Sequence, residues 1–263
     1  MRRVCEALLA TSCVVLASSA ARPDDADLAK QLANPVSSLI SVPFQSNYDC
    51  CFGPNNASRY LLNIQPVVPI SLNHDWNLIV RTILPVLSIG SIAPGISSST
   101  GLGDTVQSFF LSPSQSVGGV TWGVGPAFLW PTGNATFGSG KWGAGPTGVV
   151  LKQDGGWTYG VLANHIWSYA GDSLRSEVSS TFLQPFLVYT FPDTTGIALN
   201  TESTYDWVRG QWTVPINLMV SRIFKIGDQR VQFQVGPRFY AVRPAGGPDW
   251  GARFNMTLLF PRK

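Results

Sequence analysis

Apolar and polar residues alternate one by one along much of this chain, and this period of two limits what it can fold into. From position 60 to 72 the even residues are Tyr, Leu, Ile, Pro, Val, Ile and Leu, while the odd ones include Asn63, Gln65 and Ser71. The segment from Trp250 to Phe260 repeats the pattern. Successive side chains of a β-strand point to opposite faces, so each such segment predicts a strand with one apolar face.

The apolar stretches are too short for helices that cross a membrane. After residue 20, no uninterrupted apolar run approaches the roughly 18 residues that such a helix needs. The alternation instead predicts an even number of strands, twelve, as a single-chain bacterial barrel requires when both ends stay in the periplasm. The predicted strands are 39–48, 58–73, 76–89, 103–111, 120–130, 142–152, 157–169, 180–191, 196–207, 211–223, 230–241 and 250–260.

The lengths of the connections between these segments favour an up-and-down barrel, in which short periplasmic turns alternate with longer outer loops. Short links, such as 74–75 and 192–195, follow the even-numbered strands, and long ones, such as 90–102 and 131–141, follow the odd-numbered strands. Two joins fit this alternation poorly. The link 112–119 is long for a turn, and 208–210 is short for an outer loop.

Composition separates a membrane barrel from a soluble β-sandwich, which also alternates. Only 13% of the residues are charged, against about 25% in an average soluble domain. A sandwich core would hold roughly one or two tryptophans, whereas this chain has 9. All of them lie at or near predicted strand ends, as the two aromatic girdles of a membrane barrel require: Trp76, Trp122, Trp130, Trp142, Trp157, Trp167, Trp207, Trp212 and Trp250.

Prolines inside the predicted strands are the main objection to this fold, because each removes one hydrogen bond from the ladder. They predict bulges or an uneven ladder. The positions are Pro66, Pro85, Pro126, Pro146, Pro185, Pro215 and Pro237.

The first 21 residues read as a signal peptide for export. Arg2 and Arg3 precede a short apolar stretch, and Ser18-Ser19-Ala20 supplies small residues, so cleavage is expected near Ala20 or Ala21. A lipoprotein would need Cys13 as the modified residue, but Ala10 stands where a bulky leucine is expected. We therefore expect three parts: the signal peptide 1–21, an N-terminal periplasmic segment 22–38, and an outer-membrane barrel 39–263.

The segment 22–38 contains one or two predicted helical turns over 27–34, which Pro35 ends. It could be a periplasmic tether or a small plug inside the barrel, and the tether is the preferred interpretation. After cleavage the chain keeps the adjacent pair Cys50 and Cys51, which is neither a disulfide framework nor a zinc ligand set. We expect two loop thiols or one strained local disulfide.

Nine short segments give the chain a resemblance that spans nearly all of the mature chain. They are Asn34–Gln45, Asn63–Pro66, Asp75–Ile79, Gly101–Asp104, Gly123–Pro126, Gly138–Trp142, Trp157–Gly160, Asn164–Trp167 and Gln184–Phe186. Together they resemble a bacterial outer-membrane family whose members are often labelled transporter or, misleadingly, neuromedin U, and which is related to barrel proteins of meta-pathway phenol degradation. The resemblance implies a barrel and a transport role. Cys50 and Cys51 depart from the family, where polar or aromatic residues are expected.

No pattern in the sequence predicts catalysis, a metal site or a cofactor. The glycines of Gly101–Asp104 and Gly123–Pro126 lack the ending and the strand-loop-helix context of a phosphate loop. His165 shares the apolar face of its strand with Trp157 and Trp167, and His74 lies in a turn. An outer-membrane lipid hydrolase would need a serine, a histidine and an asparagine together, but the neighbours Asn164 and His165 point to opposite faces, with Ser168 close by in sequence.

The polar faces of the strands are predicted to line a narrow lumen. Its principal candidates are Arg81, Asn164, Gln184, Glu202, Asn217, Arg238, Arg253 and Asn255, with Asn63, Gln65, Asn77, Gln107, Asn200 and Gln234 on the same predicted face. Three arginines against Glu202 leave this lumen net positive, which favours anionic or hydrogen-bond-accepting solutes.

Two functions remain open at this point. The first is passive uptake of small solutes, including aromatic or apolar ones, and the second is a non-conducting structural or recognition barrel with a sealed polar core. The expected partners are outer-membrane lipid, a small-molecule solute and the barrel-assembly machinery. A formal charge of +3 is too small to indicate nucleic acid.

Overall fold

The computed structural model describes residues 23–260, which form one helix and fifteen strands. The elements are α1 (Pro23–Leu32), β1 (Ile40–Phe52), β2 (Ala57–Ile64), β3 (Val67–Ser71), β4 (Trp76–Ile89), β5 (Ser99–Leu102), β6 (Thr105–Pro113), β7 (Val120–Trp130), β8 (Lys141–Asp154), β9 (Trp157–Gly171), β10 (Ser179–Thr190), β11 (Gly196–Thr201), β12 (Ser203–Asp206), β13 (Gln211–Ile226), β14 (Gln229–Val242) and β15 (Trp250–Phe260).

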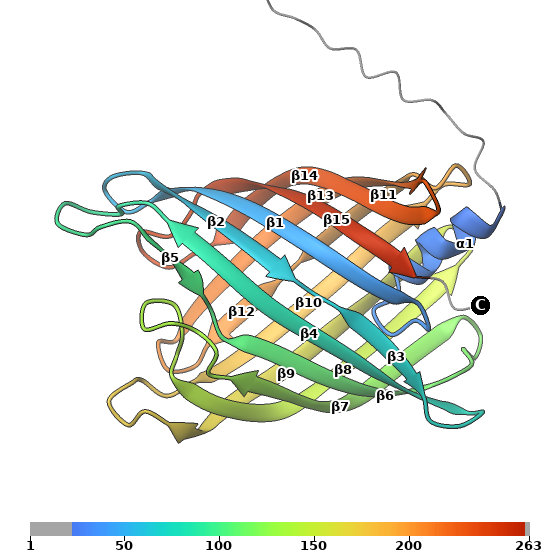
Figure 1. The fold of residues 1–263 in the computed structure, drawn as a ribbon, viewed down its shortest axis with the longest axis horizontal. Helices are drawn as coiled ribbons and strands as arrows, with labels where there is room; N and C mark the ends of the chain where they lie inside the picture. Colours follow the sequence, from blue (N-terminus) through green and yellow to red (C-terminus); the bar gives the residue numbers. More distant parts are fainter. Residues whose placement is uncertain (1–22, 261–263) are drawn as a thin grey trace, which may run out of the picture.

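The strands close into one antiparallel barrel (Figure 1). The first strand β1 pairs with the last strand β15, and β9 pairs with β10, so the sheet has no free edge. Three of the twelve crossings consist of two strands each, namely β2 with β3, β5 with β6, and β11 with β12. The predicted all-β barrel of twelve strands is confirmed.

Glycine-proline pairs explain how the ladder accommodates prolines at three places. Around Gly125-Pro126 the ladder between β6 and β7 has a gap from Ser108↔Ala127 to Leu111↔Val124, with the same register on both sides. Equivalent gaps occur between β8 and β9 at Gly145-Pro146 and between β13 and β14 at Gly236-Pro237. Since proline has no N–H to donate, the neighbouring strand loses its partner there.

The glycine of each pair lets the neighbouring backbone come close. A Cβ on Gly145 would lie 1.8 Å from the carbonyl oxygen of His165, and on Gly125 or Gly236 it would lie 2.0 or 1.9 Å from the facing carbonyl oxygen. No side chain fits at these positions without moving backbone. The predicted unevenness of the ladder thus consists of gaps at three glycine-proline sites and a register shift between Val214 and Pro215.

The two ends of the barrel differ in the length of their connections. The helix and the end of β15 share one end (Figure 1), which we call the helix end; its turns include 155–156 and 227–228. The opposite loop end carries the longer segments 90–98, 131–140 and 172–178. The two poorly fitting joins are present as 114–119 at the helix end and 207–210 at the loop end.

The outer surface is apolar and ringed by aromatic side chains near both ends. At the helix end Trp76 packs edge-on against Trp122, with ring centroids 5.9 Å apart. At the loop end Trp130 packs against Trp142 at 5.4 Å. The wall between carries exposed aliphatic residues such as Val150, 47% exposed. Indole rings at two levels with an aliphatic band between them are the pattern of a membrane-spanning barrel.

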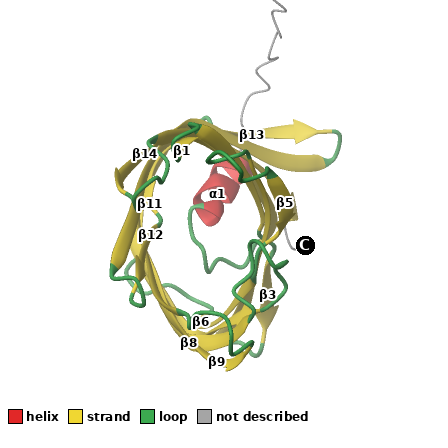
Figure 2. Ribbon diagram, turned by 90° about the vertical axis from the view of Figure 1, so that its left-hand side faces the viewer, coloured by secondary structure: helices red, strands yellow, loops and turns green. Residues whose placement is uncertain are grey.

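The helix α1 lies inside the ring of strands (Figure 2). Its Leu28 and Ala29 are buried against the inward-facing Ile223 and Leu259. Asp25 forms an ion pair with Arg230. The helix begins at Pro23, four residues before the predicted turns; proline suits a first helical turn because its missing N–H has no partner there. Among residues 23–260 no helix is long and apolar enough to cross a membrane. The predicted signal peptide, residues 1–21, lies outside the described range.

Candidate functional site

Part of the barrel interior is apolar. Val36, from the segment that follows α1, is buried among Ile79, Phe110, Leu151 and Leu162 of the barrel wall. The expectation that the enclosed faces are polar throughout is therefore wrong on β4, β6, β8 and β9. On these strands apolar inward residues alternate with polar ones such as Arg81 and Asn164, and apolar residues also cover the outer face, so the sequence did not single out the apolar inward positions.

A set of polar side chains crosses the lumen beyond this apolar patch, and we call it the charged layer. It consists of Asn47, Asp49, Arg59, Glu202, Arg238, Tyr240 and Arg253. Asp49 is fully buried and accepts hydrogen bonds from Arg59 at 2.8 Å and from the Tyr240 hydroxyl at 2.8 Å. Burying a charge is costly unless it is paired and hydrogen-bonded, and Asp49 is both.

Glu202 is the second carboxylate of the charged layer. It accepts two hydrogen bonds from Arg253, at 2.8 and 2.6 Å, and lies 3.6 Å from Arg238. Asn47 joins the two arginines, since its Oδ1 accepts from Arg238 at 3.0 Å and from Arg253 at 2.7 Å. Glu202 sits at the break between β11 and β12. The layer is thus a connected network that fixes the side chains in place.

The sequence predicted only part of this layer. Glu202, Arg238 and Arg253 were predicted lumen residues, and the structure brings them together. Asn47, Asp49 and Arg59 were missed, although Asn47 and Asp49 share the parity of the buried Gln45 on β1. The predicted strand ended at residue 48 and so left Asp49 out, whereas Asn47 and Arg59 lay inside predicted strands and were missed there.

A cavity of about 220 Å³ lies between the barrel wall and the N-terminal segment; we call it the helix-end cavity. Arg81, Gln184 and Asn255, three predicted lumen residues, line it. Arg81 donates a hydrogen bond of 2.9 Å to Gln65, which also lines the cavity. The residues Ala29 to Pro35 contribute most of the remaining boundary at the helix end.

The predicted lumen residues Asn200 and Gln234 also line this cavity. Asn217 is fully buried and donates to Asn200 at 2.8 Å, and Asn164 shares its face of β9 with the buried Leu162. The prediction that Gln107 faces inward is wrong. It pairs with Thr82 on the outer face and donates to that hydroxyl at 3.1 Å, because the buried Ser108 takes the inward position.

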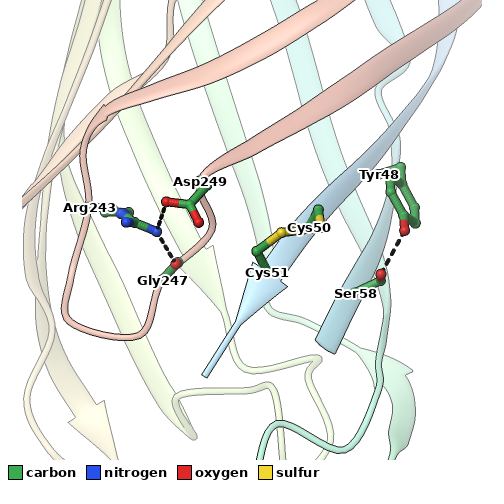
Figure 3. Close-up of a disulfide and its surroundings, with 7 residues drawn as sticks. All are labelled: Tyr48, Cys50, Cys51, Ser58, Arg243, Gly247 and Asp249. Atoms are coloured by element: carbon green, nitrogen blue, oxygen red, sulfur yellow. Dashed lines mark hydrogen bonds and ion pairs between the residues drawn. A yellow bond between two sulfur atoms is a disulfide. The ribbon is translucent and has the colours of Figure 1, made fainter. Parts of the chain in front are cut away.

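Cys50 and Cys51 form a disulfide between adjacent residues at the loop end of β1 (Figure 3). Cys51 has a φ of 76°, in the left-handed region. The Cys50 carbonyl accepts from the Asp249 N–H at 3.3 Å, and Asp249 pairs with Arg243 across the 243–249 loop. Of the two states that the sequence left open, the structure has the disulfide. It ends the regular part of β1 just beyond Asp49.

The histidine of the predicted apolar face has no carboxylate partner among the residues that the structure describes. The Nδ1 atom of His165 lies 2.7 Å from the Thr181 hydroxyl, and its ring packs on Trp167 at 3.9 Å. Its Nε2 atom lies 3.5 Å from the Ser179 hydroxyl. Within residues 23–260, no group of three or more His, Cys, Asp or Glu side chains could hold a metal ion.

Known proteins resemble this chain in fold. An outer membrane channel from Pseudomonas putida F1 superposes with a TM-score of 0.65 at 16% identity, covering 84% of this chain and 94% of that one. The β domain of the Bordetella autotransporter BrkA gives 0.47 at 10% identity, with 85% and 100% covered. Outer membrane phospholipase A from Escherichia coli gives 0.45 at 12% identity, with 89% and 98% covered. No protein-family model and no curated protein matches the sequence.

The chain is therefore an outer-membrane β-barrel, located in the outer membrane. Its helix end, with the short turns, is the periplasmic end by the rule for such barrels.

Proposed function

We propose that this protein is a channel for the passive passage of small solutes across the outer membrane. The observation that carries the proposal is the helix-end cavity, which lies inside a closed barrel whose lumen also holds the charged layer. A lumen with fixed hydrogen-bonding groups and internal space can admit a solute and orient it. The proposal includes no enzymatic step, so the solute moves down its own gradient.

The proposal extends to the kind of solute. The sequence segments described above resemble barrel proteins of phenol degradation, and Val67, Phe186 and Val188 give the cavity an apolar side. We therefore expect compact solutes with an aromatic or other apolar part.

Refolded protein in proteoliposomes tests the proposal directly. Swelling in small organic solutes and conductance steps in planar bilayers are the expected results, with protein-free membranes as the control. Membranes that stay silent in both assays would refute passage.

A non-conducting barrel is the second candidate, and the packing of Val36 across the lumen favours it. If the barrel does not conduct, Val36→Asp, which should dislodge the N-terminal segment, leaves the conductance at zero as in the parent. Under the channel proposal it conducts more.

A lipid hydrolase is a weaker alternative, based on the Ser179 and His165 contact on the outer face. The His165 Nδ1 partner is a threonine hydroxyl, whereas a triad uses a carboxylate or amide to orient the ring. Release of fatty acid from phospholipid micelles that disappears in Ser179→Ala would support this alternative.

A further inference from the structure

Arg81 differs from the other arginines that face the lumen. Arg59, Arg238 and Arg253 each have a carboxylate oxygen within 4.0 Å. In the described part of the chain Arg81 has none within that distance, and its hydrogen bond is to the neutral amide of Gln65. A guanidinium group removed from bulk water without a negative partner is unfavourable, so a negative ligand would compensate it.

The charge of the surroundings points the same way. Arg59, Arg81, Arg238 and Arg253 face two carboxylates, those of Asp49 and Glu202. These six groups together carry two formal positive charges. Both carboxylates lie within 4.0 Å of the other three arginines, and Glu202 acts on Arg81 only from a longer distance.

Arg81 borders the helix-end cavity, and the cavity offers further donors. The amides of Gln184, Gln234 and Asn255 also line it. An amide group can donate two hydrogen bonds. A ligand in this cavity would therefore meet a guanidinium group and amide donors, which suit a carboxylate.

Apolar side chains lie beside these polar groups. Val67 pairs with Arg81 across β3 and β4, and Phe186 and Val188 share one face of β10 with Gln184. All three apolar residues line the cavity, and Val67 and Phe186 also pack against the cluster around Val36. A small inorganic anion would leave these side chains without a partner. The volume of about 220 Å³ exceeds the roughly 150 Å³ of an engineered cavity that binds benzene, so one ring or a short chain fits.

We propose that the helix-end cavity binds a small organic carboxylate, with its carboxylate on Arg81 and its apolar body against Val67, Phe186 and Val188. The inference rests on the proposed function, because it names the class of solute that the channel takes. Binding itself is independent of conduction and can be measured separately.

The test is equilibrium binding to the refolded full chain in detergent micelles, measured by calorimetry with benzoate, neutral benzamide and inorganic phosphate. Benzoate should bind, whereas benzamide and phosphate should bind at least tenfold more weakly. In Arg81→Gln the affinity for benzoate should fall by roughly 10- to 100-fold, since a charge-assisted bidentate pair is lost. Arg222→Gln is the matched control, because Arg222 follows the cavity residue Ser221 on β13 and points outward.

Several results would overturn the inference: no benzoate binding to the parent, equal binding of benzamide or phosphate, or unchanged benzoate affinity in Arg81→Gln. If that variant does not refold, the comparison of the three probes on the parent still decides. Conductance without benzoate binding would remove this inference and leave the channel proposal intact. Benzoate binding in a barrel that does not conduct would remove the channel proposal and leave the binding site intact.

Discussion

Replacing Glu202 with glutamine removes one of the two carboxylates of the charged layer and keeps the shape of the side chain. Arg253 loses both hydrogen bonds to a charged acceptor, at 2.8 and 2.6 Å. The side chains of Arg253 and Glu202 are only 3% and 18% exposed. Removing one partner of a buried pair costs about 3 to 5 kcal/mol. Because Glu202 keeps some contact with lumen water, we expect about 3 kcal/mol, the lower end of that range.

Equilibrium unfolding in urea, followed by tryptophan fluorescence, measures this cost. A double-mutant cycle with Arg253→Met separates the pair from its surroundings, and a coupling of roughly 1 to 3 kcal/mol is expected for residues in direct contact. The same variant tests selectivity: with a third uncompensated positive charge in the lumen, the reversal potential in a salt gradient should shift toward anions.

An unfolding midpoint for Glu202→Gln equal to that of the parent would refute the account of the charged layer. Additive single variants in the cycle would refute the direct Glu202–Arg253 interaction. A conducting channel whose selectivity does not change would place the ion pathway away from this layer.

Three further predictions concern the wall, the N-terminal segment and a loop. Gly145→Ala should abolish refolding, seen as loss of heat-modifiable mobility in gels, because its Cβ would meet the His165 carbonyl at 1.8 Å; Gly148→Ala on the same strand, where the nearest atom is 3.7 Å away, should refold normally. Val36→Asp places a carboxylate among apolar side chains at a cost of several kcal/mol, so the segment 23–38 should become protease-sensitive and conductance should rise; Val117→Asp, in an exposed turn, is the control, and an unchanged digest would contradict the buried position of Val36. Hydrogen bonds from Lys141 and Ser168 lower the pKa of Glu177, so the docking of loop 172–178 is present above the ordinary glutamate pKa and is lost as the pH falls through the lowered one. Amide exchange in this loop should speed up on acidification and lose that pH dependence in Glu177→Gln; equal pH profiles would argue against the contact.

Strand positions were predictable from the sequence because the alternation is local to each segment and lipid outside contrasts with water inside. The contrast fails where both faces are apolar, as around Ile79 on β4, which packs inward on Val36. No pattern within the segment itself indicates that its inward apolar face packs against another part of the protein. The tether-or-plug alternative could not be decided for the same reason, since Leu28 and Ala29 are ordinary residues of an amphipathic helix until Ile223 and Leu259 are placed beside them.

The charged layer shows a different limit. Polar residues at inward positions predicted a polar lumen, but the pairing of Arg253 with Glu202 joins positions 51 residues apart. Their contact depends on how many strands separate them around the ring and on the register of each pair. Arg81 looked equivalent to Arg238 and Arg253 in the sequence, and only the structure distinguishes it by its lack of a nearby carboxylate.

The short segment 33–39 joins α1 to β1, so α1 stays tethered to the barrel wall when it leaves its site in the lumen. A helix released from Ile223 and Leu259 stays within a few nanometres of its site, so its effective concentration there is in the millimolar range or above, as for any short tether. Rebinding is then an intramolecular event that competes with every solute arriving from the periplasm. The fraction of time that the helix is away from its site depends on the effective concentration of the tethered helix relative to the bulk concentration of the solute. Lengthening the segment 33–39 with glycine and serine would change that fraction without altering any contact of the helix.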